Sequence, residues 1–188
     1  MRKRGTTGSL FRRLHADRDG VAMIEGAIIS SFMVIMLVGM LELVAYFSTA
    51  VKIAEASDGI ANITTLEADM SSSKVDDLGD VIALFLEPIS ATGTPYVVAQ
   101  AVYLTDGSAS LGTADGGWVE ARNGMVADTS KLRQMATGLG LPGEAMIIVQ
   151  IEYAYSAVLS TPFSATMPTR IVETAMAKPR IGRAIVFN

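Results

Sequence analysis

A glycine and a glutamate at the start of a long apolar run are the residues whose chemistry is most informative. Gly20 precedes Val21, and Glu25 is the fifth residue of any chain that begins at Val21. Glycine leaves room for a peptidase at the residue before a cut because it has no side chain. Cleavage there would free an α-amino group at Val21 that is positively charged at neutral pH, since its pKa is roughly 8. The Glu25 carboxylate could neutralise that amine in its own chain or in a neighbour.

The apolar run that follows is long enough to cross a membrane as a helix. Residues 26–41 contain no charged side chain, and only Glu42 interrupts the run before Val51. A helix over residues 21–51 is about 45 Å long, which exceeds a hydrocarbon core of roughly 30 Å. An ionised side chain inside a membrane is costly, so Glu25 and Glu42 each call for an explanation. Either acid could reach the headgroups from a rim of the membrane or take part in helix packing.

The distribution of charge predicts the topology and excludes several classes of protein. Before Val21 there are six Lys and Arg against two Asp, and after Phe47 there are nine against fifteen Asp and Glu. The Lys and Arg excess holds the N-terminal side in the cytoplasm, so the rest of the chain should lie outside. Nothing indicates nucleic-acid binding, and a chain without cysteine has neither a disulfide framework nor a thiolate site. The single histidine, His15, lies on the cytoplasmic side, which excludes a hydrolase with a histidine base.

The pattern divides the chain into a leader, an anchor, an extension and one domain. Residues 1–20 are a basic cytoplasmic leader that we expect to be removed, and residues 21–51 are the transmembrane helix. In the extension, residues 52–70, an apolar stripe at helical spacing predicts an amphipathic helix: Ile53, Ala56, Ile60 and Ile63. Residues 71–188 then form a small periplasmic domain.

That domain is predicted to be α+β, with a mostly antiparallel sheet and two or three helices. One helix covers residues 75–86, with Ser73 and Asp76 as a capping pair, and another covers residues 129–139 with Leu132, Met135, Ala136 and Leu139 on one face. Strands are expected at residues 96–104, 118–122, 145–159, 170–177 and 181–187. Trp118 and Tyr96, Tyr103, Tyr153 and Tyr155 are interpreted as core and sheet packing. The acids Asp76, Asp77 and Asp80 are interpreted as a solvated helix start rather than a cation site.

The N-terminal pattern resembles a known family of pilus proteins. Gly20, Glu25 and the apolar helix resemble the processing signature of type IV prepilins and pseudopilins. The fuller pattern is similar to the TadE-like proteins of the Flp/Tad (tight adherence) pilus system, through Gly20, Glu25, the aliphatic run, Gly39, Glu42-Leu43, Ala50, Ala54, Ala56 and Ala61. The resemblance implies a minor pilin or pseudopilin in the bacterial inner membrane, with a processing site at Gly20, Val21 and Glu25 and membrane assembly contacts at Glu25, Gly39 and Glu42. Its implied partners are the membrane, a prepilin peptidase, other pilins and the pilus assembly platform.

Two other interpretations remain open from the sequence. The apolar run could be a signal peptide cut near Ala50, which would release a binding or enzymatic domain. The chain could also be a single-pass protein that is never cut. The favoured interpretation is a structural protein with no catalytic residue, metal site or cofactor, because the domain has no recognisable catalytic set.

Overall fold

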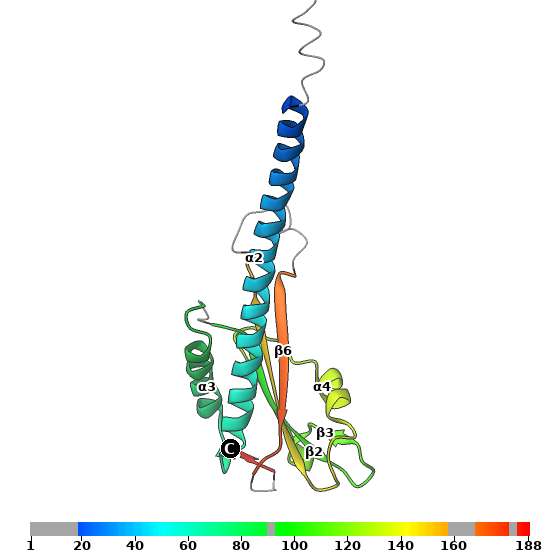
Figure 1. Ribbon diagram of the computed structural model, residues 1–188. Helices are drawn as coiled ribbons and strands as arrows, with labels where there is room; N and C mark the ends of the chain where they lie inside the picture. The colour runs from blue at the N-terminus through cyan, green and yellow to red at the C-terminus, as the bar shows by residue number, and fades with distance from the viewer. Residues whose placement is uncertain (1–18, 90–92, 158–167, 181–183) are drawn as a thin grey trace, which may run out of the picture.

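A long helix carries a small α+β domain on its C-terminal half (Figure 1). The computed structural model describes residues 19–89, 93–157, 168–180 and 184–188. The helix is α2 (Asp19–Thr64), and its N-terminal half projects from the domain. The other elements are β1 (Asp69–Met70), α3 (Ser72–Phe85), β2 (Tyr96–Tyr103), β3 (Ala109–Ser110), the 3-10 helix η1 (Thr113–Asp115), β4 (Trp118–Arg122), α4 (Thr129–Ala136), β5 (Ala145–Ala154), β6 (Arg170–Ala177) and β7 (Val186–Phe187).

Helix α2 ends earlier than the sequence pattern indicates. We expected helix through residue 70, but α2 stops at Thr64, and Asp69–Met70 is the short strand β1. Beyond the helix, Thr65 and Leu66 still donate backbone hydrogen bonds to Ala61 and Ile63. β1 pairs in parallel with β7, and Met70 is buried. Tertiary pairing therefore sets the backbone of this segment.

The sheet is antiparallel, with β5 at its centre. β5 pairs with β2 on one side and with β6 on the other. The outer edge of β2 is shared, because β4 pairs with residues 96–100 and β3 with residues 102–103. The strands expected at residues 96–104, 118–122 and 170–177 are confirmed within one residue. The strand expected at residues 145–159 ends at Ala154, and its last two residues lie outside the described chain.

The two faces of the sheet are covered by different helices. On one face, the predicted stripe of α2 and the inward side of α3 pack on alternate strand residues; this core contains Ile53, Ala56, Ile60, Val75, Leu78, Ile82, Tyr96, Val98, Trp118, Ile147, Val149 and Ile151. On the other face, α4 packs over a smaller core of Val97, Ala99, Ala101, Tyr103, Leu132, Ala136 and Ile148. The alternation is the period of two that a strand requires.

Helix α4 is shorter than expected. It starts where predicted, and the side chain of Asp128 accepts a hydrogen bond from the backbone N–H of Lys131. It ends at Ala136, whose carbonyl accepts a hydrogen bond from the Tyr103 hydroxyl at 2.9 Å. Gly138 then adopts a positive φ of 83°, which ends the helical path. Leu139 is therefore exposed, and its predicted place on the buried face is wrong.

Helix α3 is capped by a different serine from the one the pattern indicated. Its N-cap is Ser71, whose hydroxyl accepts a hydrogen bond from the Lys74 backbone N–H at 3.4 Å. The predicted pair of Ser73 with Asp76 is wrong, because the helix has already begun at Ser72. This start places Asp76 one turn inside the helix, where it can reach the sheet.

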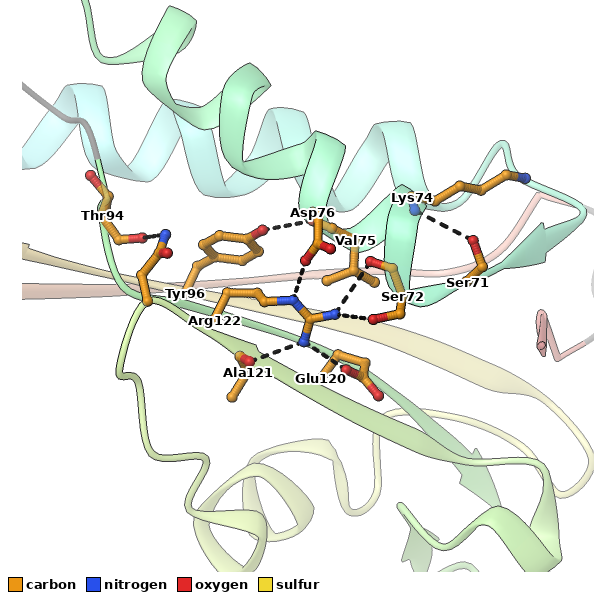
Figure 2. A network of polar contacts seen from close by, with 11 residues as sticks. Ser71, Ser72, Lys74, Val75, Asp76, Thr94, Tyr96, Glu120, Ala121 and Arg122 are labelled. Atoms are coloured by element: carbon orange, nitrogen blue, oxygen red, sulfur yellow. Dashed lines mark hydrogen bonds and ion pairs between the residues drawn. The ribbon is translucent and has the colours of Figure 1, made fainter.

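An arginine on β4 ties α3 to the sheet (Figure 2). Arg122 donates through Nε to Asp76 and through Nη1 to Glu120 at 2.7 Å. Its Nη2 donates to the hydroxyl of Ser72 at 2.7 Å. Bonds to Asp76 and then Glu120 raise the pKa of Arg122. Next to this cluster, the Tyr96 hydroxyl donates to the backbone carbonyl of Val75 at 2.6 Å, so α3 is fixed to both β4 and β2.

The C-terminal segment is held by a buried glutamine rather than by a long strand. Of residues 181–187, only Val186 and Phe187 are a strand, and residues 181–183 lie outside the described chain. The fully buried Gln100 donates to the carbonyls of Gly116 and Ile185 and accepts from the Ile185 N–H at 2.7 Å. Trp118 donates from Nε1 to the same Ile185 carbonyl at 3.2 Å. These bonds satisfy buried polar groups and tie the chain end to the sheet.

Candidate functional site

The N-terminal part of α2 is an apolar rod that projects from the domain. Every residue from 20 to 37 is exposed, and the first half-buried positions are Val38 and Gly39. We call residues 20–37 the arm; at 1.5 Å per residue it is about 27 Å long. The arm has apolar side chains all round, which is typical of a helix that lies in an apolar environment. In Figure 1 it extends beyond the domain along the axis of α2.

The predicted processing residues lie at the start of the arm. Gly20 and Val21 are in the first turn of α2, and a side chain at Gly20 would have open space around it. Val21 and Glu25 are four residues apart, so they lie on the same face of the helix. Within the described part of the chain, no hydrogen bond or ion pair reaches the Glu25 carboxylate, which is exposed.

Glu42 lies where the arm meets the domain, and it is buried there. Its side chain is 1% exposed, and its Oε1 accepts a hydrogen bond from the Tyr155 hydroxyl at 2.9 Å. Tyr155 directly follows β5 and is 7% exposed. The ring of Tyr155 meets the ring of Tyr46 edge-on, with centroids 5.1 Å apart. Burial, followed by the hydrogen bond to Glu42, raises the pKa of Tyr155 to about 12. The hydrogen bond therefore joins helix and sheet at one end of the domain.

The three predicted assembly residues do not form one cluster. Gly39 is half-buried and lies one turn before Glu42, so these two mark the base of the arm. Glu25 is seventeen residues before Glu42, which is about 25 Å along the helix axis. The carboxylate of Glu42 is engaged within its own chain, whereas that of Glu25 faces outward at the far end.

Beyond Glu42 the same helix changes character. Its inward side contributes Ile53, Ala56 and Ile60 to the core, as predicted. Its outward side is apolar at Val44, Phe47 and Val51 and becomes polar at Glu55, Asp58 and Asn62, all of which are exposed. The helix is thus apolar all round at one end and amphipathic at the other.

Sequence reasoning missed the partners that fix α2 and α3 to the sheet. Tyr155 was interpreted as sheet packing, which is correct for its ring but omits its bond to Glu42. Arg122 was not singled out, because only Glu120 among its partners is near in sequence, whereas Asp76 and Ser72 are 46 and 50 residues away. In the described residues, no group of three or more His, Cys, Asp or Glu side chains is arranged to hold a metal ion.

The comparisons with known proteins give no family for this arrangement. No protein-family model, curated protein or solved structure matches the chain. Among the described residues, α2 is the one helix whose length and composition allow it to cross a membrane. A signal sequence near an N-terminus has the same two properties. The long apolar helix packed on an antiparallel sheet is consistent with a pilin-like fold.

Proposed function

We propose that this chain is a membrane-anchored minor pilin or pseudopilin that acts in assembly of a Flp/Tad-type adhesion pilus. The observation that carries the proposal is a single continuous helix, α2, whose first half is an exposed apolar arm and whose second half packs on an antiparallel sheet. The arm begins with Gly20, Val21 and Glu25, which resemble a prepilin processing site. Its role is structural, and it involves no catalysis.

In this proposal the arm spans the inner membrane and the domain lies in the periplasm. An arm of about 27 Å, extended by the apolar residues up to Leu41, matches a hydrocarbon core of roughly 30 Å. The basic residues before Val21 retain the N-terminus in the cytoplasm. Protease added to spheroplasts is expected to digest the domain while it spares the arm. Full protection of the domain in sealed spheroplasts would contradict this topology.

Processing is the first step of the proposed pathway, and Gly20 is its most sensitive residue. Gly20→Leu should block the peptidase and leave a product that is heavier by residues 1–20, measured by mass spectrometry of the membrane fraction. Gly26→Leu is the matched control, because Gly26 is also an exposed arm glycine with open space at its Cβ position. Gly26→Leu should be processed normally. Equal masses for wild type and Gly20→Leu would refute the processing site.

Assembly then depends on the amine that cleavage exposes. We propose that Glu25 neutralises the Val21 amine at a contact between two helices, because Val21 and Glu25 lie on one face at the start of α2. Glu25→Gln keeps the shape of the side chain but leaves a positive charge poorly paired in a low-dielectric site, which costs roughly a few kcal/mol. The variant should insert and be cut, yet lose crosslinks to its pilin partner and lose surface pili.

Glu42→Gln is the matched control for that experiment. The amide oxygen of Gln can still accept from the Tyr155 hydroxyl, so the contact between helix and sheet is kept. Glu42 is also remote from the amine, so the effect on pili should be smaller. Crosslinks and pilus numbers in Glu25→Gln equal to wild type would leave a passive anchor as the better account.

The signal-peptide alternative makes a different prediction about the mature N-terminus. A cut near Ala50 would remove Glu42 and Tyr46, which contact Tyr155, and would expose part of the core to which Ala50 contributes. These contacts favour a chain that keeps α2 whole. N-terminal sequencing of the purified protein distinguishes the cases, because the first residue is Val21 after prepilin processing, Val51 after signal-peptide cleavage and Met1 without cleavage.

A further inference from the structure

An aromatic cluster lies at the end of the domain that carries the arm, on α2 and just after β5. Tyr46 and Phe47 are neighbours on α2 with ring centroids 5.8 Å apart, and Tyr46 meets Tyr155 of the sheet at 5.1 Å. Tyr155 is nearly buried, but Phe47 is 62% exposed and faces outward. The cluster of Tyr46, Phe47 and Tyr155 therefore joins the core of the domain to its surface at the base of the arm.

The length of the apolar helix sets the level of this cluster relative to the membrane. Residues 21–41 span about 31 Å, which equals the thickness of a hydrocarbon core. Tyr46 and Phe47 lie about 8 to 9 Å further along the axis, and their side chains lean back toward the N-terminus of the helix. The headgroup layer adds about 5 to 8 Å on each side of the hydrocarbon. The rings thus reach the headgroup layer, where Tyr and Trp side chains are enriched.

The domain also shields the Glu42 carboxylate, whose charge would otherwise oppose placing this part of α2 at the membrane surface. Glu42 is the first residue after the uncharged run, so it would enter the hydrocarbon boundary. A carboxylate at that depth is unfavourable unless it has a partner. Tyr155 supplies a hydroxyl donor at 2.9 Å, and Glu42 is buried within the fold instead of facing lipid. The helix can therefore enter the membrane up to Leu41 only if the end of the domain comes down with it.

We propose that the end of the domain formed by Tyr46, Phe47 and Tyr155 is a lipid-binding surface that rests in the headgroup layer and sets the depth of α2. The inference depends on the membrane-spanning part of the proposed function and is independent of pilus assembly. The occupant is the phospholipid surface, because the exposed apolar face of α2 runs on from the arm to Val44 and Phe47, at the level of the headgroup layer, and the outward face is polar at Glu55 and Asp58.

Five exposed residues spaced by seven form a natural ladder for testing depth: Ser30, Leu37, Val44, Val51 and Asp58. Seven residues are close to two helical turns, so these positions share one face at steps of about 10 Å. The chain has no cysteine, so each position can carry a single Cys with a nitroxide label and no other change. The full chain is reconstituted in vesicles of phosphatidylcholine and phosphatidylglycerol, and accessibility to oxygen and to a water-soluble nickel complex gives each depth.

The proposal expects labels at residues 30 and 37 in hydrocarbon, a label at residue 44 at the headgroup level, and labels at residues 51 and 58 in water. A label at residue 30 that is fully open to nickel would refute the membrane-spanning function itself. If the label at residue 30 lies in the hydrocarbon but the label at residue 44 is as accessible to nickel as the label at residue 58, the lipid-binding surface is refuted and the membrane-spanning function is not. Labels at residues 44 and 51 shielded from both reagents would also overturn it, because they would show a protein contact.

A second substitution tests whether the aromatic side chain sets the depth. Phe47→Ala, combined with the label at residue 44, should shift that label toward water. Val126→Ala is the matched control, because Val126 is also an exposed apolar residue but lies between β4 and α4, outside this cluster. An unchanged depth at residue 44 in Phe47→Ala would refute the role of the cluster, whatever happens to pilus assembly.

Discussion

The two halves of α2 have the same backbone but opposite surroundings. In residues 20–37 every side chain is exposed, and apolar residues occupy all faces. From Glu42 to Thr64 one face is buried against the sheet, and the outward face becomes polar after Val51. The arm therefore owes its apolar character to an environment outside the chain, and the second half owes its apolar stripe to the fold. Substitutions can distinguish the two halves, because the same change should affect membrane insertion in the arm and the stability of the domain in the second half.

The largest expected difference comes from shortening an isoleucine in each half. Ile60 is fully buried between α2 and the sheet, so Ile60→Ala should lower the free energy of unfolding of the domain by about 2 to 5 kcal/mol. Ile29 is exposed on the arm, so Ile29→Ala should change it by less than about 0.5 kcal/mol. Urea unfolding in detergent, followed by the fluorescence of the buried Trp118, measures both. Equal losses would mean that the arm packs on the domain.

A charged substitution should have the opposite pattern, with a large effect on membrane insertion in the arm and none in the second half of α2. Ile29→Arg puts a cation in the middle of the arm, which disfavours insertion by about 2.5 to 3.5 kcal/mol on insertion scales. Asp58→Arg changes an exposed residue on the domain half and should leave insertion unchanged. The fraction resistant to alkaline extraction from membranes measures the effect. If both variants remain membrane-bound like wild type, the arm does not span the bilayer.

The hydrogen bond at the junction should matter less than either change. Tyr155→Phe removes the donor to Glu42 and leaves a buried carboxylate with one partner fewer, at a cost of about 1 to 3 kcal/mol. Tyr153→Phe is the matched control, because Tyr153 lies near the end of β5, two residues before Tyr155, and no hydrogen bond of its hydroxyl occurs among the described residues. Thermal unfolding of both variants measures the difference, and equal melting temperatures would contradict the role of the bond.

The same bond predicts a dependence on alkaline pH. Folding raises the pKa of Tyr155 to about 12 from the ordinary tyrosine value of 10.0, so the unfolded state loses this proton first. The contribution to stability is fully present below pH 10 and is lost as the pH rises to about 12. Tyr155→Phe should therefore lose less stability than wild type between these values. Parallel stability curves for the two proteins would show that Tyr155 is not the titrating group.

Local patterns were enough to predict the arm and most of the sheet. An uncharged run and an alternation of two are properties of neighbouring residues, so residues 26–41 and β5 could be recognised without any tertiary information. The contact between the base of the arm and the sheet could not be recognised in this way, because its hydrogen bond joins Tyr155 and Glu42, which are 113 residues apart. The pair of β1 and β7 involves two residues on each strand, which is too short to leave a pattern. The sequence therefore predicts which segments are apolar, and long-range contacts decide where each one ends.

The predicted processing and assembly residues differ in how well their positions can be inferred from neighbouring residues alone. Gly20, Val21 and Glu25 are close in sequence, so their placement within the first two turns of an exposed helix follows from helical geometry alone. Glu42 was equally consistent with a rim position and with packing, and only the position of Tyr155 distinguishes them. Arg122 and Asp76 are likewise 46 residues apart.

The smallest expected effect compares one glycine in each half. Gly59 faces α3, and a Cβ there would lie 2.7 Å from Cζ of the Phe85 ring, so Gly59→Ala must displace that ring. Alanine favours a helix by up to about 1 kcal/mol over glycine, which offsets part of the cost, and we expect a net loss of about 1 kcal/mol. Gly26→Ala meets no atom within 4 Å and should leave unfolding of the domain unchanged. Urea midpoints measured side by side test this. A gain of stability in Gly59→Ala would mean that Phe85 turns away without cost and that α3 does not require the close approach to α2.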